Sequence, residues 1–401
     1  MARLLAALAL LLTACARPTA APTAAPTAGA PAPAAASALA PAAQAPRIEH
    51  FSLRSDRLSA FAGRDVSFEA VVLTPAGYDP ACGHPALYFV HGFGSGALRM
   101  AAAYAGSVLD RPRDDPAPPL LRVFLDANHP LGHHVFADSE NTGPWSSALV
   151  DELLPAIEAR YGAPAEADAR FLSGHSSGGW ASLWLQIDHP ATFAGAWSLA
   201  PDPVDFRSFT NVDLYRATSM YVAADGTPTP LVRSGGEVVM TLEDFVREPE
   251  GREIFASFDA VFSPRGADGP LPLFDRASGR IDPEIARSWE RYDVRARLQR
   301  EWAALAPQLR GKLHVIVGDA DDYYLDVPAR LLAAELERLG SDASVLFVPG
   351  RGHADIFDPH PELYPAGLIA SIEDAMWARF LATHPSTPLA DGSACAPRSR
   401  G

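Results

Sequence analysis

Short apolar runs alternate with helical patterns along the chain from residue 47 onward. The runs that predict strands are residues 66–73, 86–90, 122–126, 169–172, 194–199, 313–317 and 344–348. The patterns that predict helices are residues 148–161, 178–187, 327–339 and 363–382. Unbroken apolar strands separated by helices are typical of a mostly parallel sheet with helices on both faces. We therefore expect an α/β fold.

The predicted helix over residues 148–161 contains a proline. Ser146 and Ser147 precede its first apolar residues and are candidate caps. Pro155 lacks the main-chain N–H that a helix interior needs, so the helix must kink or restart there.

Residues 201–311 break the alternation of strands and helices. This segment is rich in Asp, Arg, Pro and Gly, and it lies between two predicted strands. A structureless loop of that length is implausible in a compact domain. We expect an inserted cap with helical pieces, such as residues 282–310, within one catalytic domain that spans residues 47–401.

The first 15 residues have the proportions of a secretory signal. An apolar run of 13 residues, Leu4 to Ala16, follows Arg3, and it is shorter than the roughly 20 residues of a spanning helix. The stretch from Leu12 to Cys15 resembles the bacterial lipoprotein box, which implies a lipid on Cys15 and a place at the cell envelope, on the periplasmic face or the outer membrane. The alternative is an ordinary signal peptide that contains a chance cysteine.

Residues 16–46 differ in composition from everything that follows. They contain 16 Ala and 7 Pro among 31 residues, so they have no apolar face to bury and predict a disordered tether. The only membrane contact we expect is through the N-terminal lipid.

Charge and cysteine content narrow the partners and the compartment. The formal net charge is −15 and Lys312 is the only lysine, so nucleic acid is not an expected partner. With Cys15 assigned to the lipid, Cys82 and Cys395 remain as a pair that an oxidising compartment could join. The alternative is two free thiols.

A nucleophile-elbow motif follows the strand at residues 169–172. The sequence Gly174-His175-Ser176-Ser177-Gly178 has the pattern Gly-X-Ser-X-Gly between a strand and a helix. The turn requires glycines because strand and helix approach closely around a strained serine. Ser176 is therefore the candidate nucleophile, at a helix N-terminus that favours developing negative charge.

A serine hydroxyl needs a base and an acid, which follow in the order Ser, Asp, His in this strand and helix arrangement. After the strand at 313–317, Asp321 occupies the Gly-X-X-Asp position, with Asp319 and Asp322 as rivals. After the last strand, His353 lies in a Gly-rich turn. We expect Asp321 to orient His353, and His353 to accept the proton of Ser176.

The turn after the strand at residues 86–90 supplies the expected oxyanion hole. Its sequence is His91-Gly92-Phe93-Gly94, in which glycines let main-chain N–H groups face a ligand. Phe93 and Ser177 are the expected main-chain donors, whereas His91 more simply shapes the turn.

These motifs resemble the putative-esterase family of α/β-hydrolases, a group that includes esterase D, feruloyl esterases and ferric-enterobactin esterase. The matching pieces are Val72 to Asp79, Tyr88 to Gly92, Gly174 to Gly179, Gly318 to Asp321, and Gly352-His353. The resemblance implies an α/β-hydrolase fold and ester hydrolysis or acyl transfer through a serine acyl-enzyme. It leaves the substrate open, because the cap departs from the compact members.

Other polar clusters are weaker candidates. His129, His133 and His134 could hold a metal, but their irregular spacing favours a polar loop at the site rim. Trp145 could stack on a sugar or aromatic group or simply pack, and with His129 it is a candidate substrate contact. The sequence shows no phosphate loop or dinucleotide fingerprint, so we expect no metal and no cofactor.

Three functional hypotheses remain from the sequence. The first is a lipid-anchored serine esterase acting on a small-molecule or carbohydrate-linked ester. The second is an acyltransferase, in which an alcohol instead of water enters the acyl-enzyme. The third is a non-catalytic surface lipoprotein that binds through its cap; a strained serine turn argues against it.

Overall fold

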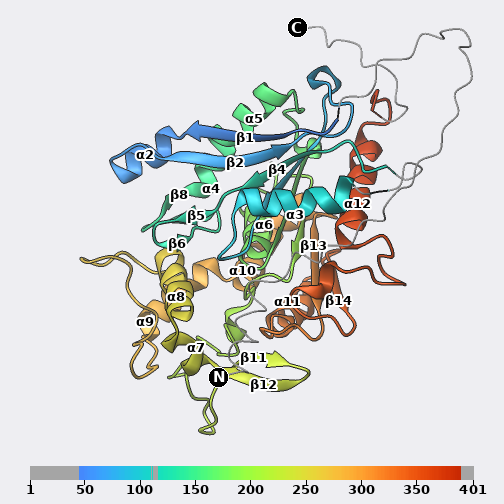
Figure 1. The fold of residues 1–401 in the computed structure, drawn as a ribbon. Helices are drawn as coiled ribbons and strands as arrows, with labels where there is room; N and C mark the ends of the chain where they lie inside the picture. Colours follow the sequence, from blue (N-terminus) through green and yellow to red (C-terminus); the bar gives the residue numbers. More distant parts are fainter. Residues whose placement is uncertain (1–44, 110, 112–115, 390–401) are drawn as a thin grey trace, which may run out of the picture.

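A computed structural model describes residues 45–109, 111 and 116–389 of the chain. Its centre is an eight-stranded sheet in the order β1-β2-β4-β3-β9-β10-β13-β14 (Figure 1). All pairs from β4–β3 to β13–β14 are parallel, and β1–β2 and β2–β4 are antiparallel. The strands are β1 (Ile48–Arg54), β2 (Ser67–Leu73), β3 (Ala86–Val90), β4 (Leu121–Leu125), β9 (Arg170–His175), β10 (Gly195–Leu199), β13 (Leu313–Gly318) and β14 (Ser344–Val348).

The seven apolar runs all form strands of this sheet, and the expected α/β fold is confirmed. The sequence pattern missed β1. Among its seven residues only Phe51 is buried, because β1 lies at the edge of the sheet. It pairs on one side only, with β2, so it lacks the unbroken apolar run of the central strands.

Helices cover both faces of the sheet. Successive strand residues alternate between two cores: Leu87 and Phe89 pack in one, and Tyr88 and Val90 in the other. The first core includes residues of α3 (Ala97–Leu109) and α12 (Leu368–Thr383), whereas the second includes residues of α5 (Leu154–Tyr161), α6 (Ser177–Asp188) and α10 (Val294–Leu309). Helix α11 (Asp326–Arg338) packs beside β13 and β14.

The helix expected over residues 148–161 restarts at its proline. Helix α4 (Trp145–Ala148) passes into a π-helical segment, Leu149–Leu153, and α5 then begins with Pro155 in its first turn. A proline is tolerated there because the first-turn N–H groups have no partner within their own helix.

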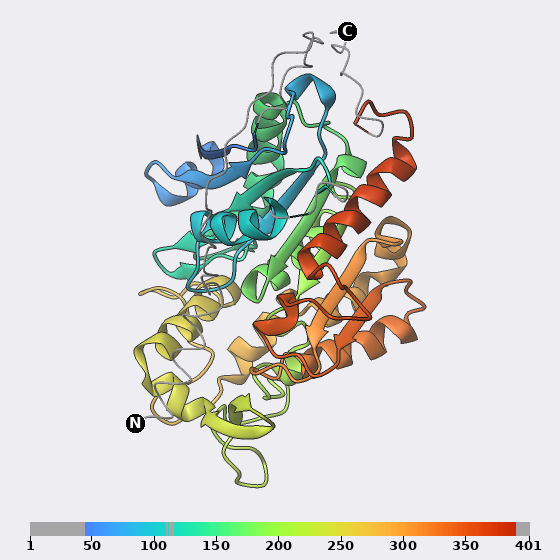
Figure 2. The ribbon, with the colours of Figure 1, turned by 45° about the vertical axis from the view of Figure 1, so that its right-hand side comes forward.

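The inserted segment folds into a cap beside the carboxyl ends of the strands (Figure 2). It contains a hairpin and three helices: β11 (Pro230–Ser234), β12 (Glu237–Thr241), α7 (Leu242–Arg247), α8 (Pro249–Phe262) and α9 (Pro283–Trp289). Helix α10, at the end of the expected insert, instead contacts α6 and α11 of the sheet-covering layer.

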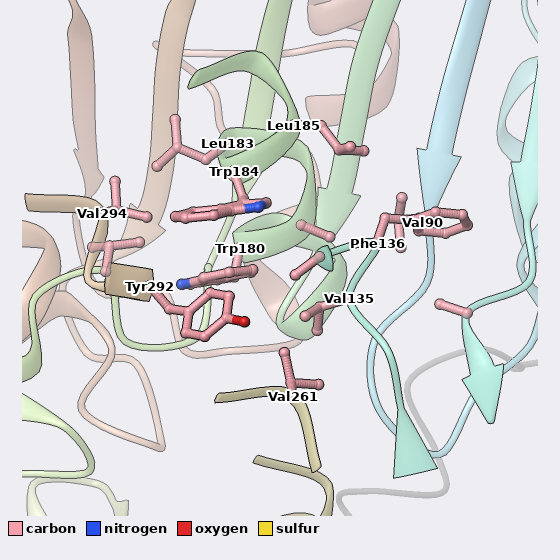
Figure 3. Packing of buried hydrophobic residues seen from close by; sticks show 14 of the residues in the cluster. Val90, Val135, Phe136, Trp180, Leu183, Trp184, Leu185, Val261, Tyr292 and Val294 are labelled. Carbon is pink, nitrogen blue, oxygen red and sulfur yellow. The ribbon is translucent and has the colours of Figure 1, made fainter. Parts of the chain in front are cut away.

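An aromatic cluster fastens the cap to the sheet domain. Trp180 and Trp184 of α6 stack at a centroid distance of 5.1 Å, and they lie beside Tyr292 (Figure 3). Phe262 of α8 packs 5.2 Å from Trp180 and 5.2 Å from Tyr292. Trp289 of α9 packs 5.2 Å from Phe262. The cap therefore shares a core with the helix that follows the candidate nucleophile.

The N-terminal predictions lie outside the described residues. These are the signal segment, Cys15 and almost all of the tether; Cys395 also lies outside. Cys82 is disulfide-bonded, and its pairing with Cys395 stays a prediction. Within residues 45–109, 111 and 116–389, no helix combines the length and apolar character needed to cross a bilayer.

Candidate active site

Ser176 occupies a sharp turn between β9 and α6. Its backbone has φ 60° and ψ −122°, a conformation that costs energy for any residue with a side chain and is characteristic of a nucleophile elbow. The motif glycines are sterically required. A Cβ atom on Gly174 would lie 2.2 Å from the carbonyl oxygen of Gly178, and one on Gly178 would lie 2.0 Å from that of Val90.

The structure brings His353 and Asp321 together. The Nδ1 of His353 lies 2.8 Å from Oδ2 of Asp321. Asp321 is fully buried, and its Oδ1 accepts the main-chain N–H groups of Tyr323 and Leu325 at 2.9 and 3.2 Å. These bonds fix the carboxylate against the imidazole ring.

The two rival acids have other partners. Asp319 accepts the main-chain N–H of Gly350 at 2.7 Å. Asp322 accepts the main-chain N–H of His353 at 2.9 Å. Of the three neighbouring carboxylates, Asp321 is therefore the one that is hydrogen-bonded to the imidazole.

The mutual attraction of His353 and Asp321 outweighs the effect of burial on the pKa of each group. Burial alone would lower the pKa of His353, but the Asp321 carboxylate stabilises the imidazolium, so the pKa of His353 is raised above 6.5. Burial alone would raise the pKa of Asp321, but the charge and hydrogen bond of His353 lower it. The acid is thus ionised at neutral pH and favours a protonated His353.

His175 supports His353 from the nucleophile turn. Burial lowers the pKa of His175 to about 3, so its ring is neutral and Nε2–H donates to the main-chain oxygen of His353 at 3.0 Å. The two rings lie 4.5 Å apart. The X of Gly-X-Ser-X-Gly is unspecified in the motif, so no sequence pattern singles out His175.

Asp202 is a site residue that the sequence reasoning missed. The hydroxyl of Ser177 donates to its Oδ2 at 2.6 Å, and that of Ser176 to its Oδ1 at 3.4 Å. Burial raises the pKa of the Asp202 carboxyl. Asp202 follows β10, which pairs with β9, so only the strand order could have placed it beside Ser176.

The turn after β3 lies directly against the nucleophile turn. A Cβ on Gly92 would lie 3.2 Å from that of Ser176. His91 is buried and braces this turn: its Nδ1–H donates to the Gly92 oxygen at 2.7 Å, and its Nε2 accepts the N–H of Ala127 at 2.9 Å.

A cavity of about 640 Å³ joins these residues to the cap. Ser176, His353, Asp202, Phe93 and Ser177 all line it. Most of the cap residues in its wall are apolar: Leu231, Val232, Val238, Val239, Phe245, Ile254, Phe255, Phe258, Val261 and Phe262.

Trp145 and His129, the candidate substrate contacts, pack against neighbouring rings in the structure. Trp145 is 5% exposed, stacks on His134 at 3.7 Å, and donates its indole N–H to Thr142. His129 lies against the edge of Trp145, and its Nδ1 accepts the N–H of Leu131. Neither residue is among those that line the cavity. Trp145 begins α4 and turns its ring into the core, which the polar residues around it in the sequence do not reveal.

The neighbouring histidines also have structural contacts. The Nε2 of His133 lies 2.9 Å from the main-chain oxygen of His91. Burial lowers the pKa of His133 to about 3. In the part of the chain that the structure describes, no group of three or more His, Cys, Asp or Glu residues is placed to hold a metal ion.

Comparisons with known proteins identify the family and the fold. The model of the family described as "Putative esterase" matches residues 63–339. A ferulic acid esterase structure has a TM-score of 0.53 at 14% identity, covering 84% of this chain and 99% of that chain. An S-formylglutathione hydrolase from Agrobacterium tumefaciens has a TM-score of 0.47 at 14% identity, covering 85% and 95% of the two chains. No curated protein matches the chain. The α/β-hydrolase fold is thereby confirmed.

Proposed function

The chain belongs to the putative-esterase family and is a serine esterase, and we propose that it works through a Ser176–His353–Asp321 triad. One observation carries the assignment. The strained Ser176 and the Asp321-bound His353 line the same cavity, as a nucleophile and an oriented base must.

Each residue then has one task in the reaction. Oγ of Ser176 attacks the ester carbonyl while Nε2 of His353 takes its proton. The main-chain N–H groups of Phe93 and Ser177 stabilise the negative oxygen of the tetrahedral intermediate. His353 returns the proton to the departing alcohol, which leaves an acyl group on Ser176. Water, activated by the same histidine, then releases the carboxylic acid.

Replacement of the nucleophile tests this function. Removing a triad serine typically costs on the order of 10⁶ in kcat, so Ser176→Ala should abolish both hydrolysis of p-nitrophenyl acetate and labelling by a fluorophosphonate. Ser182→Ala is the matched control. Ser182 lies on α6, the helix that follows Ser176, and its hydroxyl donates to the main-chain oxygen of Gly179. Equal labelling of the Ser176→Ala and wild-type proteins would contradict the assignment.

We also propose that the enzyme is held at the cell envelope by a lipid on Cys15. The lipobox-like stretch from Leu12 to Cys15 and the Ala/Pro-rich segment after it support this anchoring. Cys15→Ser should release the enzyme from the membrane fraction of cells, because a lipid anchor needs its cysteine. Retention of the Cys15→Ser protein in that fraction would contradict the anchor.

A further inference from the structure

The candidate nucleophile divides the cavity into two sides. Ser176 follows β9, with β3 and β4 on one side of that strand and β10, β13 and β14 on the other. His353 follows β14, on the second side. Helix α8 of the cap contacts β6 (Gly132–His133), which follows β4, so α8 stands on the first side, with the turn that carries Phe93.

The wall that α8 contributes is almost wholly apolar. Its lining residues are Ile254, Phe255, Ser257, Phe258, Val261 and Phe262. The one polar residue among them, Ser257, bonds the main chain of His133. Its Oγ accepts the main-chain N–H of His133 at 2.8 Å and donates to the main-chain oxygen of His133 at 3.2 Å. A substrate group on this wall gains dispersion contacts and burial from water.

We propose that the α8 wall binds a linear aliphatic acyl chain, so that the enzyme prefers medium-chain fatty acyl esters to acetate esters. This inference rests on the proposed function. His353 must protonate the departing alcohol, so the alcohol lies on its side of Ser176 and the acyl group extends toward α8. A hydroxylated aromatic acyl group fits less well, because the α8 wall would leave its hydroxyl without a partner.

The size of the cavity agrees with such a chain. Its volume of about 640 Å³ lies within the range of sites that enclose a small-molecule ligand. Burial of each added methylene should raise kcat/KM by about fourfold until the wall is covered.

A chain-length series tests the proposal. We expect kcat/KM for p-nitrophenyl octanoate to exceed that for the acetate by at least about tenfold, with both esters below micellar concentrations. Ile254→Ser should lower this ratio by about three- to tenfold, because it places a polar group on the wall. Ile48→Ser, which changes an exposed isoleucine on β1, should leave the ratio unchanged. A wild-type ratio of one or less would overturn the proposal.

A binding measurement separates this inference from the proposed function. Calorimetry on the Ser176→Ala variant should show sodium octanoate binding at least about tenfold more tightly than sodium acetate. Equal affinities would overturn the acyl wall even if ester hydrolysis is confirmed. Tighter binding of octanoate without hydrolysis of any ester by the wild type would keep the wall and contradict the proposed function.

A separate set of contacts joins the cap hairpin to the loop that carries Asp321. The main-chain N–H of Arg233 on β11 donates to the Asp322 oxygen at 2.8 Å. Its guanidinium donates to the main-chain oxygen of Asp321 at 2.8 Å and to the Asp326 carboxylate at 2.7 Å. The guanidinium also lies 4.5 Å from the ring centre of Tyr324, a residue with a φ of 59°.

From these contacts we infer that Arg233 is a positioning residue. Through it the cap holds residues 319–325, the acid loop, in the geometry that Asp321 needs. The loop includes a strained residue, Tyr324, whose conformation its surroundings must maintain. Loss of the guanidinium should let Asp321 shift, and small displacements of catalytic groups are costly to the rate.

The values of kcat and KM distinguish a positioning role of Arg233 from a role as a residue that only lines the cavity. Arg233→Met should lower kcat for p-nitrophenyl acetate by about 10- to 100-fold with little change in KM, and Arg233→Lys should recover part of the loss. Arg330→Met is the matched control, since Arg330 also pairs with Asp326 but at 3.4 Å and from the exposed side of α11. A rise in KM with unchanged kcat in Arg233→Met would overturn the inference.

Discussion

The sheet domain and the cap hold their residues in place by different means. Ser176, Asp321 and His353 follow β9, β13 and β14, so main-chain hydrogen bonds of a parallel sheet set their separation. The cap contributes apolar side chains to the cavity, and it is held largely by packed rings. The comparison indicates that the sheet positions the chemistry, whereas the insert shapes the space for the substrate.

The two regions are nevertheless mechanically joined. Trp184 of α6 packs 5.6 Å from Tyr292, and Arg233 of the hairpin bonds the acid loop. Because the cap shares a core with the helix that follows Ser176, we expect the two regions to unfold as one cooperative unit. Substitutions in either region should therefore be measured for effects on both the reaction and the fold.

The largest expected effect comes from replacing the carboxylate of Asp321. Asp321→Asn keeps the shape of the side chain but removes the charge that orients and stabilises His353, so kcat should fall by about 10⁴. The fold should survive, because the change is isosteric. Hydrolysis of p-nitrophenyl acetate and circular dichroism of the variant test both statements.

Asp319→Asn is the proper control for that experiment. The Asp319 carboxylate holds the N–H of Gly350, a contact that the amide oxygen of Asn can keep, so near-normal turnover is expected. Asp322→Asn is a poorer control, because Asp322 holds the main chain of His353. A crippled Asp319→Asn beside a normal Asp321→Asn would show that the acid is misassigned.

The sequence was informative where a local pattern determines the structure. Buried parallel strands are continuous apolar runs, and the Gly-X-Ser-X-Gly turn between strand and helix is a local motif, so the sheet and the Ser176 turn could be placed. Asp202 could not be, because its contact with Ser176 depends on β10 pairing with β9. The buried Trp145 shows the same limit, since the four-residue helix that it begins is too short for a periodicity to mark its buried side.

The cap was the least predictable region for a related reason. Its apolar residues contact one another across separate short elements, as Phe209 does with Phe258 and Trp289. Such pairs have no fixed spacing in the sequence. Composition could therefore identify an insert and its helical end, but it could not identify an apolar wall beside the nucleophile.

The next largest effect should come from the core of the cap. Trp289 is fully buried among Phe206, Phe209 and Phe262, and its indole N–H donates to Ser263 at 2.8 Å. Trp289→Ala should lower the free energy of unfolding by about 3–5 kcal/mol. Urea unfolding followed by fluorescence and by esterase activity should give coincident transitions. Loss of activity well before the main transition would show that the cap unfolds alone.

The smallest expected effect is a shift in the pH dependence of kcat/KM. Burial alone would lower the pKa of His353, but the carboxylates of Asp321, Asp202 and Asp322 raise it above 6.5. The proposed mechanism requires an unprotonated His353 to accept the proton of Ser176, so kcat/KM should rise with pH through this raised pKa.

Removal of the Asp202 carboxylate should move the acidic limb of the pH profile of kcat/KM to lower pH. Asp202→Asn takes away a carboxylate whose charge favours the imidazolium, so the pKa of His353 should fall and the acidic limb of kcat/KM should move to lower pH. The midpoint is the readout, because Asp202 also bonds Ser176 and Ser177 and its loss can change the rate at every pH. Asp56→Asn, an exposed charge at the start of α2 (Asp56–Ala62), should leave the midpoint in place. An unmoved midpoint in Asp202→Asn, or one at higher pH, would show that Asp202 does not act on His353 through its charge.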